Sequence, residues 1–249
     1  MDYFQLRALA VAKEPENPEG CQDAWGADPQ QGIAIAADGV TSALFSGPWA
    51  RMLVAGALTD YPDTTSVEAF LPWLQSRRAE WETFVTGIQL EWHQQPKLQN
   101  GAFTTFVLAK ATPMEQTEPG VNNYMLSVSA LGDTMAFLIR DGKPLWSFPW
   151  THSSELSAKP LVVGSRNLGR DNMLQFTQSV ETVVSGDLLI LCTDALATWA
   201  LRQYEAGELV DWDLIWTIPE DEWTEHVIAM RANATLQVDD TTLVMARFQ

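Results

Sequence analysis

The sequence predicts a layered α+β domain. Apolar runs typical of strands fill its beginning, middle and end, and helical stretches follow the first strands and precede the last one. This order is typical of sheets covered by segregated helices. Hydrophobic residues make up 46% of the 249 residues, with 11 Trp and 10 Phe, so a large core can form. We find no internal repeat or long linker, and we expect one domain over residues 1–249.

Two strands are expected near the N-terminus. Apolar residues alternate over 3–12, which indicates a first strand, and the continuous apolar run over 32–38 indicates a buried one. Residues 13–20, rich in Pro and Glu, predict a loop between them.

Two helices are expected next. The first begins near Ser46, with Pro48 in its first turn, where a missing amide hydrogen costs nothing. The second is expected over 66–93. Tryptophans in these and later segments fall at helical spacing, so we expect core packing for Trp73, Trp81, Trp92, Trp212, Trp216 and Trp223.

The remaining strands are predicted by short apolar runs between turn residues, at 103–109, 124–131, 135–139, 145–148, 173–178, 188–193 and 242–248. Asp141-Gly142, between two of these runs, is a strong hairpin signal. Residues 151–169 are irregular, and further helices are expected over 194–204 and 219–232.

Aspartates stand at the ends of several of these strands. They are Asp23, Asp38, Asp133, Asp194 and the adjacent pair Asp239-Asp240. Carboxylates that converge at one end of a sheet repel one another, and hard divalent cations are the usual compensation. No His or Cys spacing offers a competing zinc site. The pattern therefore favours a metal-dependent hydrolase.

Charge and hydropathy argue against several other classes. The 15 basic and 32 acidic residues give a net charge of -17, which phosphate backbones repel, so we expect no nucleic-acid partner. No apolar run reaches the roughly 20 residues that span a bilayer. The first residues lack the basic and apolar regions of a signal peptide. With only two cysteines, a reduced, cytoplasmic protein without a membrane partner is expected.

Six segments in a fixed order carry a resemblance to a known family. They are Cys21-Gln22-Asp23-Ala24, Ala37-Asp38-Gly39-Val40 with Ser46-Gly47-Pro48-Trp49-Ala50, Thr104-Thr105, Leu131-Gly132-Asp133-Thr134, the run from Gly186 to Asp194, and Asp239-Asp240-Thr241-Thr242. Together they resemble the metal-dependent protein phosphatases of the 2C-like (PPM) family, especially its divergent bacterial branch. The resemblance spans nearly the whole chain.

The resemblance implies a four-layer α-β-β-α sandwich of two antiparallel sheets, with two or three Mg²⁺ or Mn²⁺ ions at one edge. It makes Asp38 the bridge between the two principal ions and Asp194 a second catalytic carboxylate, which also shares a looser third ion with Asp133. The implied metal ligands are Asp23, Asp38, the Gly39 carbonyl, Asp133, Asp194 and Asp239. The neighbouring Asp240 is expected to be solvated.

The implied reaction is hydrolysis of phosphoserine or phosphothreonine in proteins by a metal-activated water. The expected partner is a phosphorylated protein substrate, with a Ser/Thr kinase as a candidate second partner. An alternative is a phosphatase-fold module of little or no activity that binds metal or a protein for regulation. A hydrolase of small phosphoesters is a third possibility.

Two departures from the family pattern leave the substrate-binding residues open. Residues 14–20 contain no Arg where members usually hold the substrate phosphate, and Lys13 and Arg7 are candidate replacements. Val40-Thr41 replaces a His that often serves as general acid, so a metal-bound water or His152 is expected to supply the proton.

Two further features have alternative interpretations. Cys21 and Cys192 each lie two residues before a proposed metal ligand, and small buried packing is favoured over a redox role. Residues 151–169 correspond in the family to a flap that shapes substrate access, and the alternative is a plain surface loop.

Overall fold

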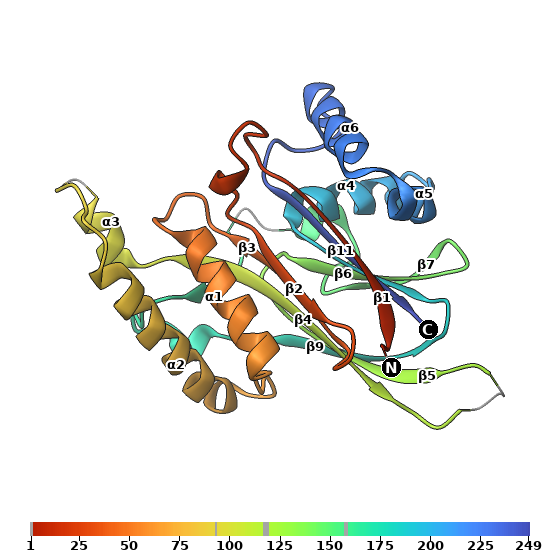
Figure 1. Cartoon of the computed structure of the whole chain (residues 1–249), viewed down its shortest axis with the longest axis horizontal. Helices are drawn as coiled ribbons and strands as arrows, with labels where there is room; N and C mark the ends of the chain where they lie inside the picture. The colour runs from red at the N-terminus through yellow and green to blue at the C-terminus, as the bar shows by residue number, and fades with distance from the viewer. Residues whose placement is uncertain (1, 93, 117–119, 157–158) are drawn as a thin grey trace.

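Two antiparallel sheets form the centre of the computed structural model, which describes residues 2–92, 94–116, 120–156 and 159–249 (Figure 1). Sheet A has the order β1 (Phe4–Val11), β11 (Thr241–Phe248), β10 (Leu188–Cys192), β6 (Met135–Arg140) and β7 (Lys143–Phe148). Sheet B has the order β2 (Ala24–Asp28), β3 (Ile33–Gly39), β4 (Phe103–Pro113), β5 (Asn123–Leu131) and β9 (Thr177–Val184), and the short β8 (Val163–Gly164) pairs with β4.

Helices cover the outer face of each sheet. On sheet B lie α1 (Ser46–Thr59) and α2 (Val67–Thr86), followed in the chain by the short α3 (Gln95–Asn100). On sheet A lie α4 (Asp194–Glu205), α5 (Trp212–Thr217) and α6 (Glu220–Ala232). Short 3₁₀ turns occupy Pro18–Gly20, Ser153–Glu155 and Asp171–Met173. Among the described residues, none of the helices is both long and apolar enough to span a bilayer.

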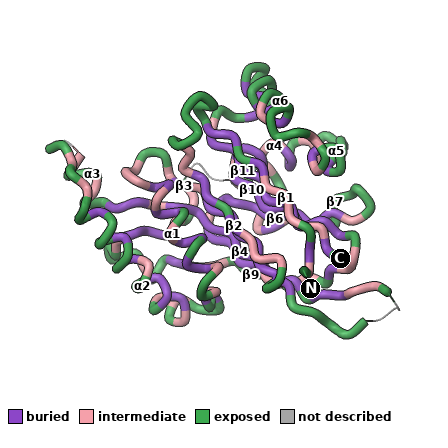
Figure 2. Tube along the Cα trace, viewed as in Figure 1, coloured by how far each residue is buried: buried purple, intermediate pink, exposed green. Residues whose placement is uncertain are grey.

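Three apolar clusters correspond to the three contacts between these four layers. In β3, Ile33 and Ile35 pack under α1 and α2, whereas Ala34 and Ala36 face sheet A. Because both faces of this strand are covered, its sequence is continuously apolar rather than alternating. Figure 2 shows buried residues along the strands of both sheets. The predicted α+β sandwich of two antiparallel sheets flanked by helices is confirmed.

The hairpin predicted at Asp141-Gly142 is present. Both residues have positive φ, 51° and 71°, which matches the two-residue turn that joins twisted strands. It connects β6 to β7, the outermost pair of sheet A.

Several predicted boundaries were wrong. The second helix ends at Thr86 rather than near residue 93, because Gly87 follows and its N–H already donates to the Phe84 carbonyl. His93 lies outside the described residues. Trp92 is 83% exposed instead of buried in the core. The strand expected over 173–178 begins only at Thr177. Strand β2 and helix α5 were not predicted.

Candidate metal centre

The strands bring five of the predicted aspartates to one end of the sandwich. Asp38 is the next-to-last residue of β3, and Asp23 immediately precedes β2, whose first residue pairs with the residue before Asp38. The other three are Asp133 before β6, Asp194 at the start of α4 and Asp239 shortly before β11. Their proximity appears in the pKa of Asp38, which is raised well above its usual value by burial and then by the charges of these four carboxylates.

The same causes act on three of the other carboxyl groups. Burial, followed by the charge of Asp240, raises the pKa of Asp23 to about 8. Burial and the charge of Asp194 raise the pKa of Asp133 to about 7. The pKa of Asp194 rises to about 6 through burial and the charge of Asp239. An uncompensated cluster of this kind holds protons that a cation would displace.

Two buried oxygens in this cluster, Asp23 Oδ1 and Asp133 Oδ1, have no hydrogen-bond partner among the described residues. An orphaned buried acceptor costs roughly 1–3 kcal/mol, so such atoms are usually satisfied by water or an ion. Among the described residues, no three or more His, Cys, Asp or Glu side chains are arranged so that they could hold a metal as they stand. The chemistry of the donor set nevertheless fits, because oxygen-only carboxylate ligands suit Mg²⁺ and Mn²⁺.

The backbone around Asp38 is held closely. The Thr104 hydroxyl donates to the Asp38 carbonyl at 2.7 Å, across the β3–β4 pair. A Cβ at Gly39 would lie 2.5 Å from the Gln22 carbonyl and 3.0 Å from the backbone of Ser46. Only glycine fits where β3, the loop before β2 and the start of α1 meet. The predicted ligand carbonyl of Gly39 therefore lies in a crowded and fixed segment.

A second glycine supports Asp133. Gly132 has a φ of 104°, and a Cβ there would lie 2.5 Å from the Thr105 side chain. Thr105 in turn is hydrogen-bonded to Thr134 through their hydroxyls. This turn fixes the direction in which β6 begins, and hence the position of the Asp133 carboxylate.

Asp240 is not solvated as expected but buried. Its Oδ1 accepts the backbone N–H of Lys13 at 2.6 Å, and its Oδ2 accepts that of Gln22 at 2.8 Å. The side chain therefore fixes both ends of the segment that leads into Asp23. Sequence reasoning missed this role because two adjacent aspartates cannot easily point to the same site, and the sequence does not show where the second one points.

The two candidate phosphate-binding cations lie in different places. Lys13 Nζ is 3.4 Å from Asp239 Oδ1. The pKa of Asp194 is raised overall by burial and by the charge of Asp239, and the charge of Lys13 acts in the opposite direction. Arg7 instead donates to the carbonyl of Ile218, between α5 and α6. Lys13 therefore lies at the carboxylate cluster, whereas Arg7 binds a backbone carbonyl beside α5 and α6.

His152, the candidate proton donor, contacts the end of α4 opposite to Asp194. Its Nδ1 lies 3.7 Å from Glu205, the last residue of α4, while Asp194 is the first. At about 1.5 Å per residue, these two ends of the helix are roughly 16 Å apart. His226, the other histidine that the structure describes, lies beside the Trp223 ring on α6.

The described residues of the segment 151–169 are anchored near its beginning and near its end. Ser153 donates its N–H and hydroxyl to Glu205 of α4, at 2.6 and 2.7 Å. At the other end, Arg78 of α2 donates to the Gly164 carbonyl at 3.0 Å and pairs with Asp171 through two bonds of 2.7 and 2.8 Å. The segment thus connects the helices of the two outer layers.

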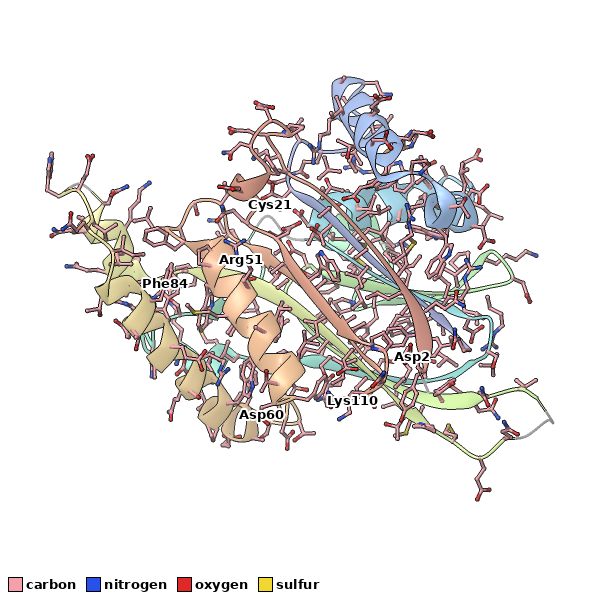
Figure 3. The ribbon with its side chains drawn as sticks, in the orientation of Figure 1. Asp2, Cys21, Arg51, Asp60, Phe84 and Lys110 are labelled. Carbon is pink, nitrogen blue, oxygen red and sulfur yellow. The ribbon has the colours of Figure 1, made fainter. Side chains whose placement is uncertain are left out.

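Neither cysteine has the lowered pKa of a reactive thiol; Cys192 packs in the apolar cluster under α4, whereas Cys21 is half-buried and belongs to none of the described apolar clusters. Burial raises the pKa of the Cys21 thiol to about 12, and Cys192 is fully buried with its pKa also raised. Reactive thiols need the opposite shift. Figure 3 shows Cys21 beside Arg51 of α1, which donates to the Cys21 carbonyl at 3.3 Å.

No protein-family model and no curated protein sequence matches this chain. Solved structures do. The photosystem II phosphatase PBCP matches with a TM-score of 0.60 and 14% identity, covering 99% of each chain. The serine/threonine phosphatase Stp1 from Staphylococcus aureus matches with a TM-score of 0.60 and 11% identity, covering 99% of this chain and 95% of that one.

A third solved structure contains metal. The catalytic domain of the serine/threonine phosphatase PstP in complex with two manganese ions matches with a TM-score of 0.57 and 15% identity, covering 98% of this chain and 97% of that one. At this level of identity the likeness shows the fold. The chain has the fold of the PPM-type serine/threonine phosphatases, as its sequence motifs predicted.

Proposed function

We propose that this protein is a Mg²⁺- or Mn²⁺-dependent phosphatase that hydrolyses phosphoserine or phosphothreonine in proteins. The observation that carries the proposal is the gathering of buried carboxylates around Asp38, two of whose members, Asp23 and Asp133, have unpartnered oxygens. The fold that the chain shares with serine/threonine phosphatases supports the proposal.

The proposed ligands divide between two principal ions and a looser third. Asp38, the Gly39 carbonyl, Asp23, Asp194 and Asp239 would hold the pair, and Asp133 would share the third with Asp194. Bound there, divalent ions would activate a water and offset charge on the phosphoryl oxygens. The chain itself contributes rigid placement: Thr193 donates its hydroxyl to Asp23 at 2.9 Å, and Thr104 holds the Asp38 backbone.

Lys13 is the proposed contact for the substrate phosphate. It is the candidate cation beside the carboxylates, and its ammonium is only loosely paired with Asp239 at 3.4 Å. An ammonium is a point charge and lacks the bidentate geometry of an arginine. We therefore expect weaker phosphate binding, and a higher KM for simple phosphoesters, than an arginine would give.

The partner required by this reaction is a phosphorylated protein, and a Ser/Thr kinase is the class of enzyme that supplies such substrates. We place both in a cytoplasmic, bacterial signalling context. The alternative remains a module of little activity that binds metal or protein, which the absence of Arg from residues 14–20 favours. Hydrolysis of small phosphoesters is a third, weaker candidate.

The first test measures hydrolysis of p-nitrophenyl phosphate and of a phosphoserine peptide with Mn²⁺, with and without a chelator. We expect turnover that the chelator abolishes. Asp38→Asn and Asp194→Asn should lose turnover while keeping the fold, whereas the exposed control Asp221→Asn on α6 should keep both. Wild-type rates in both site variants at saturating Mn²⁺ would refute the ligand assignment. A folded, metal-binding protein without turnover would favour the alternative.

The second test concerns Lys13. Lys13→Met should raise KM for both substrates about tenfold with a smaller change in kcat, since one charge-assisted contact is worth roughly 1.5–3 kcal/mol. Lys143→Met, at an exposed position on β7, is the matched control for loss of one positive charge. Equal KM values in the two variants would assign the phosphate contact to another group.

A further inference from the structure

A groove of about 320 Å³ lies beside the carboxylate cluster, outside the proposed ligands. One wall is polar and includes Lys13, Asn17 and Gln22. An apolar wall includes Leu44 and Phe45 from the segment before α1. The lining therefore combines one lysine, the carboxylates of Glu14 and Asp240 and two amide side chains with an apolar segment.

The apolar wall is built into the fold. Phe45 has a φ of 61° and packs edge-on against Phe84 of α2, with ring centroids 6.0 Å apart. The Ser46 hydroxyl donates to the Val40 carbonyl at 2.8 Å and closes the loop that carries Leu44. This wall is thus anchored to α2 and to its own loop.

The polar wall is equally fixed and is tied to the apolar one. Asp240 accepts the N–H groups of Lys13 and Gln22, as described above. The Gln22 side chain then accepts the N–H of Gly47, in the first turn of α1, at 2.8 Å. This bond joins the two walls, so the groove is formed before any substrate binds.

The groove begins where the carboxylate cluster ends. Gln22 directly precedes Asp23, and Asp240, which lines the groove, directly follows Asp239. Lys13 belongs to both places, since it lines the groove and its ammonium lies 3.4 Å from Asp239. A peptide whose phosphate lay at the cluster would extend directly into this space.

We infer that the groove binds a substrate residue next to the phosphorylated one and selects a neutral, apolar side chain there. The inference rests on the proposed function, which places the phosphate at the cluster. Leu44 and Phe45 supply apolar contact, whereas Glu14 and Asp240 on the lining and the net charge of -17 disfavour an acidic neighbour.

The test uses two series of phosphoserine peptides in which one residue, before or after the phosphoserine, is Leu, Ala or Glu. For one of the two positions we expect kcat/KM to fall about tenfold from Leu to Ala and further for Glu, because one buried Leu side chain contributes about that factor. Leu44→Ser should remove most of the preference for Leu and leave p-nitrophenyl phosphate hydrolysis unchanged. Leu209→Ser, an exposed leucine in the loop after α4, is the matched control.

A binding measurement separates this inference from the proposed function. Fluorescence anisotropy with non-hydrolysable phosphonate peptides and Mn²⁺ should show tighter binding of the Leu peptide, reduced by Leu44→Ser. If the wild-type protein does not hydrolyse p-nitrophenyl phosphate but shows this pattern of binding, the proposed function would be overturned and the groove assignment supported. Equal affinities and equal kcat/KM for Leu, Ala and Glu at both positions would overturn the groove assignment.

Discussion

The hydroxyl of Thr193 donates a hydrogen bond to Asp23 Oδ2 at 2.9 Å, between residues 170 positions apart in the chain. Thr193 follows β10 of sheet A, whereas Asp23 precedes β2 of sheet B. The same hydroxyl oxygen accepts the N–H of Thr242 at 3.0 Å, at the start of β11. One threonine therefore joins the two sheets at the end where the carboxylates gather.

Thr193→Val should destabilise the protein by about 1–3 kcal/mol. The change preserves shape but removes the hydroxyl that bonds to Oδ2 of buried Asp23 and to the Thr242 N–H, and unmade buried hydrogen bonds are costly. Urea unfolding of the metal-free protein measures the effect, with exposed Thr83→Val on α2 as the control. A difference below about 0.5 kcal/mol between the two variants would mean that the bond contributes little.

The metal-free protein should become more stable as pH falls from about 8 toward 4. Asp23, Asp133 and Asp194 have pKa values of about 8, 7 and 6 in the native state, against about 4 for an unfolded Asp. Between these limits the native state binds more protons than the unfolded chain, so the free energy of unfolding decreases as pH rises.

Saturating Mg²⁺ or Mn²⁺ should reverse this trend, because a cation bound only to the native state stabilises it most when the carboxylates are ionised. Melting temperatures across this pH range, with and without metal, measure both slopes. Asp23→Asn should flatten the metal-free curve. Stability that rises with pH without metal would contradict the electrostatic description of the cluster.

The buried strands and the aspartates at their ends were predictable, because both depend on short, local patterns. The run over 32–38 and the following Asp38 needed only the rule that a strand covered on both faces is continuously apolar. The hairpin at Asp141-Gly142 likewise follows from local turn chemistry. These features place the candidate site at one end of a sandwich before any tertiary contact is known.

Features set by distant contacts were not predictable. The short apolar run over 173–178 indicated a strand, but Asp171 is held by Arg78 of α2 and the chain forms a 3₁₀ turn first. In β2, Gly26 lies under α1 and Trp25 is 42% exposed, so no apolar alternation marks the strand. The buried role of Asp240 depends on partners more than 200 residues away.

Gly39→Ala should reduce stability and weaken metal binding together. The added methyl would lie 2.5 Å from the Gln22 carbonyl oxygen, a contact that requires backbone movement, and such overpacking costs about 1–3 kcal/mol. Gly87→Ala is the control, because its Cβ would meet only Phe84 O at 3.7 Å. Thermal unfolding with and without Mn²⁺ measures both effects. An unchanged metal-induced shift would separate Gly39 from the metal centre.

Arg78→Met should release residues 163–174 from α2. The substitution keeps the aliphatic stem but removes the bonds to the Gly164 carbonyl and the pair with Asp171, which is nearly buried. Breaking a buried ion pair from one side costs about 3–5 kcal/mol, and partial exposure of this pair lowers the expected loss to about 2 kcal/mol.

Hydrogen exchange measures where that loss appears. Amides over 163–174 should exchange faster in Arg78→Met than in the wild type, while those of β3 and β10 keep their protection, because the anchor acts on one segment rather than on the sheets. Arg202→Met, at an exposed position on α4, is the matched control. Faster exchange spread evenly over both sheets would show that Arg78 stabilises the whole fold instead of anchoring this segment.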